Sequence, residues 1–446
     1  MKQSLSRRTF LTATTVLAGV LALDRAALAQ AASRLIWWYD AALPEHQAAL
    51  DEVLILPFNE VDPSVQLAIE YRGSALSDQL MVAVAANDGP DIVMTNGPSW
   101  TDRLVGAGKL ASLDDYAEEY GWREKLPAFM LDLGSTDGVL YALPKTVETQ
   151  VLFFNKTVFE ENGYAAPKDR AEFEAIADDC LAKGIIPIAA GNAGQRFSNR
   201  WYVSIVWNAY AGPDAIYKAL AGEMPWNSEP FVEAIVMLKE WWDKGYFGGQ
   251  NYFSINSQQA FTLMAAGRYA MSPQGTWALQ WIPDSFAKSG HELDWTPLPR
   301  LRQEADYPVF PLGIGAHLAI NEASKNKDAA ARMLNMLTDP VVLGELSRLW
   351  TGEWDVPILE AIPAPNEKYA LMSQAIKAQT AAATAQNTYG YTPWSFWPPK
   401  TDDYMKAAIE EVWLGQLTPE QFCDNVQKVF EEEVAAGVVK SPPSRA

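Results

Sequence analysis

Short apolar runs alternate with segments of helical periodicity along the first quarter of the chain. Residues 34–39, 65–71 and 91–94 have the length and composition of strands. Residues 44–59 and 76–86 lie between them and carry apolar side chains at every third or fourth position. Strands that alternate with helices predict a mainly parallel sheet wound by right-handed crossovers. Ligands bind beyond the carboxyl ends of such strands, where Asp40 and the predicted loop 96–100 fall.

The same alternation continues through the rest of the chain. We predict further strands at residues 185–190 and 316–321. Helices are predicted at 156–162, 170–183, 257–266, 326–338, 340–350, 366–386, 402–414 and 419–436, with several more between 200 and 245. Residues 191–196 and 389–399 are predicted loops. The second half repeats the alternation of strands and helices of the first half, although no obvious sequence repetition relates the two. The pattern therefore indicates a second α/β lobe.

The stretch from residue 139 to residue 156, VLYALPKTVETQVLFFNK, has the pattern of a crossing between two sheets. Two β-prone runs, 139–143 and 150–154, flank a polar segment that contains Glu148. Pro144 cannot donate to a strand ladder, so the first run should end there or lie at a sheet edge. Because the chain then re-enters a strand at once, we predict that this stretch lines a cleft between two lobes.

Length and composition agree with a chain of two or more globular domains. The 446 residues exceed one ordinary core, and 49% are hydrophobic. The first residues have a different character, since Ser6-Arg7-Arg8-Thr9-Phe10-Leu11 is a twin-arginine sequence ahead of an apolar run, residues 11–23, too short to span a bilayer. Small residues at 27–29 then suit a signal peptidase. We therefore predict a signal peptide at residues 1–29 and a periplasmic mature protein.

Charge excludes two classes of partner. Removal of residues 1–29 would change 35 basic and 55 acidic residues to 31 and 54, a net charge of −23. So acidic a protein is not expected to bind nucleic acid or an anionic membrane. Beyond the signal peptide, no apolar stretch approaches the length of a transmembrane helix.

Cysteine and histidine give no indication of a metal or a catalytic centre. Cys180 and Cys423 could form a disulfide in an oxidising compartment, or remain as buried free thiols, and the sequence leaves both alternatives open. His46, His291 and His317 are scattered, without metal-like spacing. We therefore expect no cofactor and no metal.

Six blocks of sequence resemble, in the expected order, the sugar-binding group of extracellular solute-binding proteins that serve ABC importers, the maltose-binding-like receptors. These blocks are SRRTFLTA, DQLMVAVAANDGPDIV, GVLYALPKTVETQVLFFNKTVFEENG, AFTLMAAGRYAMSPQGTWAL, GAHLAINEASKNKDAAARMLNMLTDP and LGQLTPEQFCDNVQKVF. The resemblance implies two Rossmann-like α/β lobes, of the type II periplasmic binding protein fold, that close over a ligand by a hinge. By analogy, one lobe would comprise residues 30–146 and 315–360 and the other residues 147–314 and 361–440.

The resemblance also implies roles for individual residues. Glu148 matches an acid of the crossing strand that accepts sugar hydroxyls, and Trp277 matches a stacking tryptophan. Trp394 or Trp397 falls near a second stacking tryptophan, and Asp40 matches an acid after the first strand. Thr95 and Asn96 stand where the maltose receptor has an aromatic residue, so a maltodextrin is not the expected ligand.

Residue type completes the set of candidate ligand contacts. Sugar rings present apolar C–H faces and a rim of hydroxyls, which suit aromatic platforms and polar partners. Several of the 17 tryptophans stand in predicted loops or at helix starts. Arg196 and Lys145 could bind an anionic ligand, but a lone arginine or lysine is more often an ion-pair partner. The predicted ligand contacts are Tyr39, Asp40, Asn96, Trp100, Glu148, Arg196, Trp277, Trp354, Trp394 and Trp397.

The predicted function is that of a monomeric, non-enzymatic receptor. It would deliver a neutral sugar, oligosaccharide or polyol glycoside to the permease subunits of an ABC transporter. A receptor for glycerol phosphate or another charged solute is the first alternative. A secreted carbohydrate-active enzyme that uses a carboxylate pair such as Asp40 and Glu148 is the second.

Overall fold

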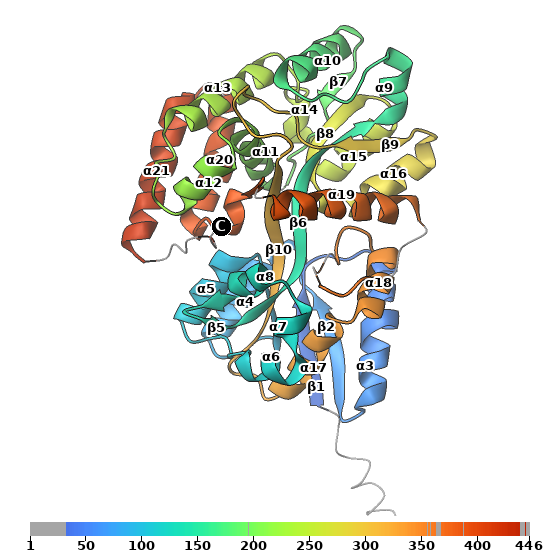
Figure 1. Cartoon of the computed structure of the whole chain (residues 1–446), viewed down its shortest axis with the longest axis vertical. Coiled ribbons are helices and arrows are strands. Elements are labelled where there is room, and N and C mark those ends of the chain that lie inside the picture. The colour runs from blue at the N-terminus through green and yellow to red at the C-terminus, as the bar shows by residue number, and fades with distance from the viewer. Residues whose placement is uncertain are drawn as a thin grey trace, which may run out of the picture.

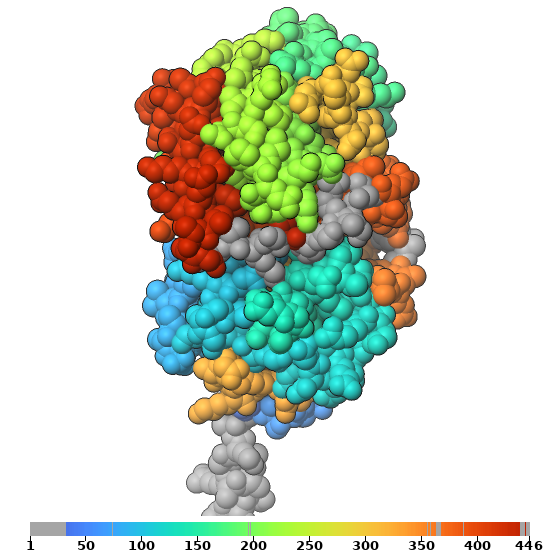
Figure 2. Space-filling model, turned by 60° about the vertical axis from the view of Figure 1, so that its left-hand side comes forward, coloured from blue at the N-terminus to red at the C-terminus, as the bar shows by residue number. Residues whose placement is uncertain are grey.

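The computed structural model describes residues 33–194, 196–354, 356, 358–362, 367–386, 388–437 and 442. The predicted signal peptide, residues 1–29, lies outside the described residues. Two α/β lobes lie one above the other, joined by two long strands (Figure 1). In Figure 2 the blue-to-cyan first lobe lies below the second lobe, and the gold segment at the bottom of the first lobe shows that the chain returns there.

The sheet of the first lobe has the strand order β2-β1-β3-β10-β6. β1 (Ser33–Tyr39) pairs in parallel with β2 (Val65–Tyr71) and β3 (Ile92–Thr95), as the alternating pattern predicts. β10 (Phe310–Ile320) runs antiparallel to both β3 and β6 (Ala142–Asn155).

The sheet of the second lobe is built on the far half of β6. There β6 pairs antiparallel with β8 (Tyr269–Gly275) and β9 (Leu293–Thr296), and β8 pairs in parallel with β7 (Ile186–Ile188). β11 (Tyr389–Tyr391) pairs in parallel with the start of β10. Both β6 and β10 therefore belong to both lobes.

The first lobe carries most of its helices before residue 134 and two more after β10. They are α2 (Pro44–Leu50), η1 (Asp51–Ile55), α3 (Leu56–Val61), η2 (Gly73–Ala75), α4 (Leu76–Ala85), α5 (Pro98–Gly106), α6 (Asp114–Tyr120), α7 (Trp122–Lys125), α8 (Ala128–Leu133), α17 (Lys327–Met336) and α18 (Pro340–Leu349). A small hairpin, β4 (Ser135–Thr136) and β5 (Val139–Leu140), precedes β6.

The helices of the second lobe come from the middle and the end of the chain. They are α9 (Lys156–Asn162), α10 (Arg170–Ala182), α11 (Phe197–Tyr210), α12 (Pro213–Leu220), α13 (Glu229–Asp243), α14 (Asn251–Ser254), α15 (Ser257–Ala265), η3 (Thr276–Gln280), α16 (Ile282–Ser289), α19 (Lys368–Ala385), η4 (Pro393–Ser395), α20 (Pro399–Trp413) and α21 (Pro419–Ala435).

Tryptophans fill the core of each lobe. In the first lobe, Trp37 and Trp354 are fully buried and meet edge to face. In the second lobe, Trp207 and Trp226 stack at 5.1 Å, and Trp242 stacks on Trp413 at 4.7 Å with almost parallel planes. Because an aromatic side chain buries about 150–250 Å², these rings supply much of the apolar surface that holds each lobe together.

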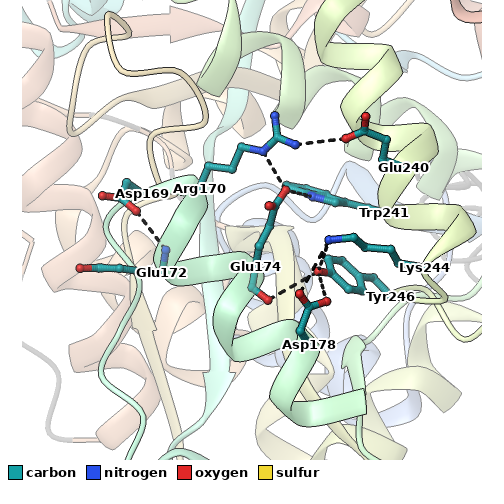
Figure 3. Close-up of polar contacts among 9 residues, drawn as sticks. All are labelled: Asp169, Arg170, Glu172, Glu174, Asp178, Glu240, Trp241, Lys244 and Tyr246. Atoms are coloured by element: carbon teal, nitrogen blue, oxygen red, sulfur yellow. Dashed lines mark hydrogen bonds and ion pairs between the residues drawn. The ribbon is translucent and has the colours of Figure 1, made fainter. Parts of the chain in front are cut away.

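Polar contacts tie the outer helices of the second lobe together (Figure 3). Arg170 on α10 donates to Glu174 at 2.7 Å and to Glu240 on α13 at 3.1 Å, and the indole N–H of Trp241 also donates to Glu174. Tyr246 donates to Asp178 at 2.6 Å. Ion pairs this exposed contribute little individually, so we assign this cluster a structural role.

The structure refines the prediction for the crossing stretch. The two predicted strands are one continuous strand, β6, which passes through Pro144 without a break. Pro144 is tolerated because β6 pairs with β10 alone there and so forms the edge of the first sheet. The return strand is likewise longer than predicted, since β10 begins at Phe310 rather than near residue 316. The lobe boundaries given above remain a proposal.

Two other predictions change. Residues 96–100 are not all loop, because α5 begins at Pro98, a favourable first-turn residue. Cys180 and Cys423 are both free and buried in the second lobe, which decides between the two alternatives that the sequence left open. Burial raises the pKa of both thiols above the ordinary cysteine value.

A glycine at the irregular point of the β6–β10 pairing provides a test of this crossing. The register shifts between Ile314 and Ala316, where Gly315 has no partner, and again between Ala316 and His317. A Cβ built on Gly315 would overlap Oε1 of Glu148 and Cγ2 of Thr146. We expect Gly315→Ala to lower the free energy of unfolding by about 1–3 kcal/mol, as overpacking does. Urea unfolding measures this. Gly106→Ala is the control, since its Cβ would meet nothing within 4 Å, and equal unfolding midpoints for the two variants would contradict the predicted close contact.

Candidate ligand-binding site

A cavity of about 300 Å³ lies between the two lobes, against the crossing strands. Its lining comes from both lobes and from β6 and β10, so no single lobe could form it. The lining residues are Asp40, Ala41, Gly73, Leu76, Ser77, Met94, Asn96, Lys145, Thr146, Glu148, Arg200, Trp201, Trp277, Gln280, Trp281, Ile314, Gly315, Ala316, Glu353 and Trp394.

The second lobe gives the pocket an aromatic wall. Trp277 stands on η3 directly after β8, and its indole folds back so closely over Gly275 that a Cβ there would overlap the ring. Trp201 on α11 lies 5.3 Å from the Trp277 ring, and Trp394 on η4 lies 5.9 Å from it, edge to face. Three elements distant in sequence thus bring their indoles together at one wall.

The first lobe gives the pocket a polar floor around a buried ion pair. Lys145, on β6, pairs with Glu353, and its side chain is only 2% exposed. Tyr39 donates its hydroxyl hydrogen to Glu353 and accepts from Lys145 Nζ at 2.9 Å. The ammonium also lies 4.7 Å from the Trp354 ring, in a cation–π contact. Burial and the Glu353 carboxylate raise the pKa of Tyr39 well above its usual value, so its hydroxyl remains protonated.

Asp40 follows β1 at the carboxyl edge of the sheet, where the fold class predicts ligands to bind. Burial and the nearby Glu353 carboxylate raise the pKa of Asp40 to about 7, against the opposing effect of Lys145. Near neutral pH this carboxyl group therefore exchanges between a form that donates a hydrogen bond and a form that only accepts.

Glu148 lies in β6 opposite Gly313 of β10 and lines the pocket. Its carboxylate crosses β10 at Gly315, where the absence of a side chain leaves room for it. Asn96, directly after β3, also lines the pocket and donates its amide hydrogen to Ser77 at 2.9 Å. These polar side chains come from β6, from the end of β3 and from α4.

Arg200 brings a second cation to the pocket, from α11 of the second lobe. It pairs with Asp402 at 3.0 Å, and both side chains are largely buried. Lys406 reaches the same carboxylate at 3.0 Å. Arg200 also lies 5.7 Å from the Trp394 ring, so a cation–π contact joins this ion pair to the aromatic wall.

The structure brings together half of the residues predicted as ligand contacts. Asp40, Asn96, Glu148, Trp277 and Trp394 all line the pocket. Tyr39 does not line it, but supports the polar floor through Glu353 and Lys145.

Four predicted contacts lie elsewhere. Trp100 is a helical residue of α5, and Arg196 is exposed and pairs with Glu410 at 3.4 Å. Trp354 is fully buried against Trp37, Tyr39 and Trp350 in the first core. Trp397 is buried against Trp207 and Trp226 in the second core. None of the four lines the pocket, so none of them is proposed as a ligand contact.

Several lining residues were not predicted as contacts from the sequence: Arg200, Trp201, Gln280, Trp281 and Glu353. Trp201 stands in a helical pattern that is typical of packing, and Glu353 gives no sequence signal beyond its place beside Trp354. Lys145, for which the sequence left an anion contact or an ion pair open, forms an ion pair, and its partner Glu353 is far away in the sequence.

Among the described residues, no group of three or more His, Cys, Asp or Glu side chains is placed to hold a metal ion. Nor does any helix in the described ranges have the length and apolar character needed to cross a membrane.

Comparison with known proteins identifies the family. The model of the bacterial extracellular solute-binding protein family matches residues 40–342. The osmoprotective compounds-binding protein GgtB of Synechocystis is 23% identical over 283 residues, which are 60% of this chain and 65% of that protein. The galactooligosaccharide-binding protein of Bacillus subtilis is 22% identical over 415 residues, 91% of this chain and 90% of that protein. The chain spans less than two-thirds of the length of the first of these relatives.

Solved structures show the same fold. A chitin oligosaccharide binding protein superposes with a TM-score of 0.80 over 91% of this chain and 99% of its own, at 24% sequence identity. The predicted two-lobed α/β fold is thereby confirmed. With a family match that covers more than half of the sequence, the chain belongs to the bacterial extracellular solute-binding protein family.

Proposed function

We propose that this chain is the periplasmic receptor of an ABC importer and that it captures a neutral sugar, oligosaccharide or polyol glycoside in the pocket between its lobes. One observation carries the proposal: an aromatic wall of Trp201, Trp277 and Trp394 faces a polar floor of Asp40, Glu148 and the Lys145–Glu353 pair. The apolar face of a sugar ring can stack on the aromatic wall, and its hydroxyls can form hydrogen bonds with the polar floor. The names of the relatives, among them a galactooligosaccharide-binding protein, support this class of ligand.

The charges of the pocket favour a neutral ligand over an anionic one. Lys145 is engaged by Glu353 and Tyr39, and Arg200 is engaged by Asp402. A phosphate would have to compete with these buried carboxylates, and breaking a buried ion pair costs about 3–5 kcal/mol. The pocket also holds the acids Asp40 and Glu148. A glycerol phosphate receptor is therefore the less favoured alternative.

The binding free energy explains why the ligand needs both the aromatic wall and the polar floor. A micromolar dissociation constant corresponds to about −8.2 kcal/mol, whereas a neutral hydrogen bond contributes about 0.5–1.5 kcal/mol net. Hydrogen bonds from the floor alone would have to be numerous, because association also costs rotational and translational freedom. Apolar contact with the indoles supplies the remainder.

The proposal has four further parts. They are closure of the lobes about β6 and β10, delivery of the ligand to a permease, export by the twin-arginine route and a monomeric state.

A ligand panel tests the ligand class and the residue that we consider most important. A neutral saccharide at 100 times its dissociation constant should raise the stability by about 2.7 kcal/mol and hence the melting temperature. We expect Trp277→Ala to weaken binding at least about tenfold, or 1.4 kcal/mol, because the stacking face is lost. Calorimetric titration measures the affinity, and Trp100→Ala is the matched control. Equal affinities in both variants would remove Trp277 from the site, and a response to phosphates alone would favour the anionic alternative.

Turnover separates a receptor from an enzyme. We expect saturable binding of a glycoside with no release of free sugar, because the family is one of solute-binding proteins and the relatives are named as binding proteins. The purified mature chain is incubated with nitrophenyl glycosides and their hydrolysis is followed by absorbance. Hydrolysis that disappears in both Asp40→Asn and Glu148→Gln would establish the carbohydrate-active enzyme instead.

The raised pKa of Asp40 predicts how stability depends on pH. The folded protein holds the Asp40 proton up to about pH 7, whereas the unfolded chain releases it near the usual value for aspartate. Between these values the folded state binds more protons, so Asp40 lowers the free energy of unfolding as pH rises. Relative to Asp40→Asn, the unmodified protein should lose about 1–2 kcal/mol between pH 4 and pH 8, since solvent at the pocket screens part of the effect. Denaturant titration at several pH values measures this, with the exposed Asp115→Asn as control. A constant difference between the protein and Asp40→Asn across this range would show that Asp40 has an ordinary pKa.

A further inference from the structure

Gln280 is a residue of the second lobe whose side-chain amide is held at both ends by the first lobe. Its Nε2 donates to Oε2 of Glu353 at 2.8 Å, and its Oε1 accepts from the indole N–H of Trp350 at 2.9 Å. An amide is suited to this position because it offers a donor and an acceptor side by side. A carboxylate would present only acceptors, and one of them would face the carboxylate of Glu353.

Both first-lobe partners are themselves held in place. The other oxygen of Glu353 is bound by Lys145 and Tyr39, on the polar floor of the pocket. Trp350 is fully buried, and its ring stacks on His46 at 4.2 Å with nearly parallel planes. Gln280 therefore binds two groups whose orientations are already fixed by the packing of the first lobe.

The backbones of the two lobes also meet at this contact. Gly352 has a φ of +88°, in the left-handed region that favours glycine. A Cβ at this position would come within 2.8 Å of the Thr276 carbonyl oxygen and 3.1 Å of Leu279 Cβ. The turn that carries Trp350 and Glu353 thus packs directly on η3, the helix that carries Trp277 and Gln280.

The contact connects the two walls of the pocket. Gln280 and Trp277 belong to the same short helix, so the position of one restricts the other. Glu353 belongs to the polar floor through its pair with Lys145. The lobes can separate here only if the two hydrogen bonds of Gln280 break. While these bonds hold, the Trp277 helix and the Lys145–Glu353 pair move as one unit.

We propose that Gln280 is a positioning residue that holds the Trp277 helix of the second lobe against the Lys145–Glu353 pair of the first, and so sets the separation of the two pocket walls before a ligand arrives. The inference concerns the same pocket as the proposed function and rests on it for its significance. Its test requires no ligand, so its failure is distinguishable from a failure of the sugar-receptor proposal.

The distance between the lobes is measured by pulsed electron spin resonance on the ligand-free mature protein. Spin labels are attached through Val61→Cys on α3 and Val434→Cys on α21, two exposed positions in different lobes. Cys180 and Cys423 are buried thiols with raised pKa values, so they react poorly with the label. Gln280→Ala removes both hydrogen bonds, and Gln280→Glu places a second carboxylate against Glu353. Gln258→Ala and Gln258→Glu, on the exposed face of α15, are the matched controls.

We expect a distance distribution in Gln280→Ala that is broader and shifted from that of the unmodified protein, and a larger shift in Gln280→Glu because the two carboxylates repel each other. The Gln258 variants should match the unmodified protein. Circular dichroism melting confirms that each variant is folded, and Gln280→Asn, whose amide is one methylene too short to reach both partners, serves if either of the first two variants fails to fold. Distributions in the folded Gln280 variants that coincide with that of the unmodified protein would overturn the proposal.

Discussion

The antiparallel pairing of β6 with β10 is the constraint on which the two-lobed structure depends. Each strand contributes to both sheets, so the backbone hydrogen bonds of one ladder continue from the first lobe into the second. The ladder is irregular at Gly315, directly beside Glu148. A bulge at this point bends and twists the strand, and both Gly315 and Glu148 line the pocket.

Much of the fold could be predicted from the sequence because its elements carry strong local signals. The strand at 65–71 and the helix at 156–162 have the predicted bounds, since clear turn or capping residues limit them. The sequence allowed either a strand end or a sheet edge at Pro144 and could not decide that β6 continues through it. This continuity depends on the strand being at a sheet edge there, which is a property of the tertiary pairing and not of the local sequence.

Some residues of the candidate site could likewise be predicted from the sequence, and others could not. Asp40, Glu148 and Trp277 could be placed because each follows or occupies a strand whose end meets the cleft, or matches a position of the family. Trp354 and Trp397 are tryptophans like Trp277, but they are buried in the cores. Residue type alone cannot distinguish an indole that stacks on a ligand from one that packs in a core. Glu353 and Lys145 form their pair across 208 residues of sequence, so only the folded arrangement shows them as one unit of the pocket.

The burial of most of the 17 tryptophans has a consequence for optical measurements. Four indoles line the pocket, Trp201, Trp277, Trp281 and Trp394, whereas most of the others absorb and emit from the two cores. A ligand in contact with the pocket indoles therefore changes a minor part of the total emission. The stacked pair Trp242 and Trp413 lies within the second lobe and is close enough for its electronic transitions to couple. Near-ultraviolet circular dichroism thus carries a signature of the packing of that lobe, separate from the signature of an occupied pocket.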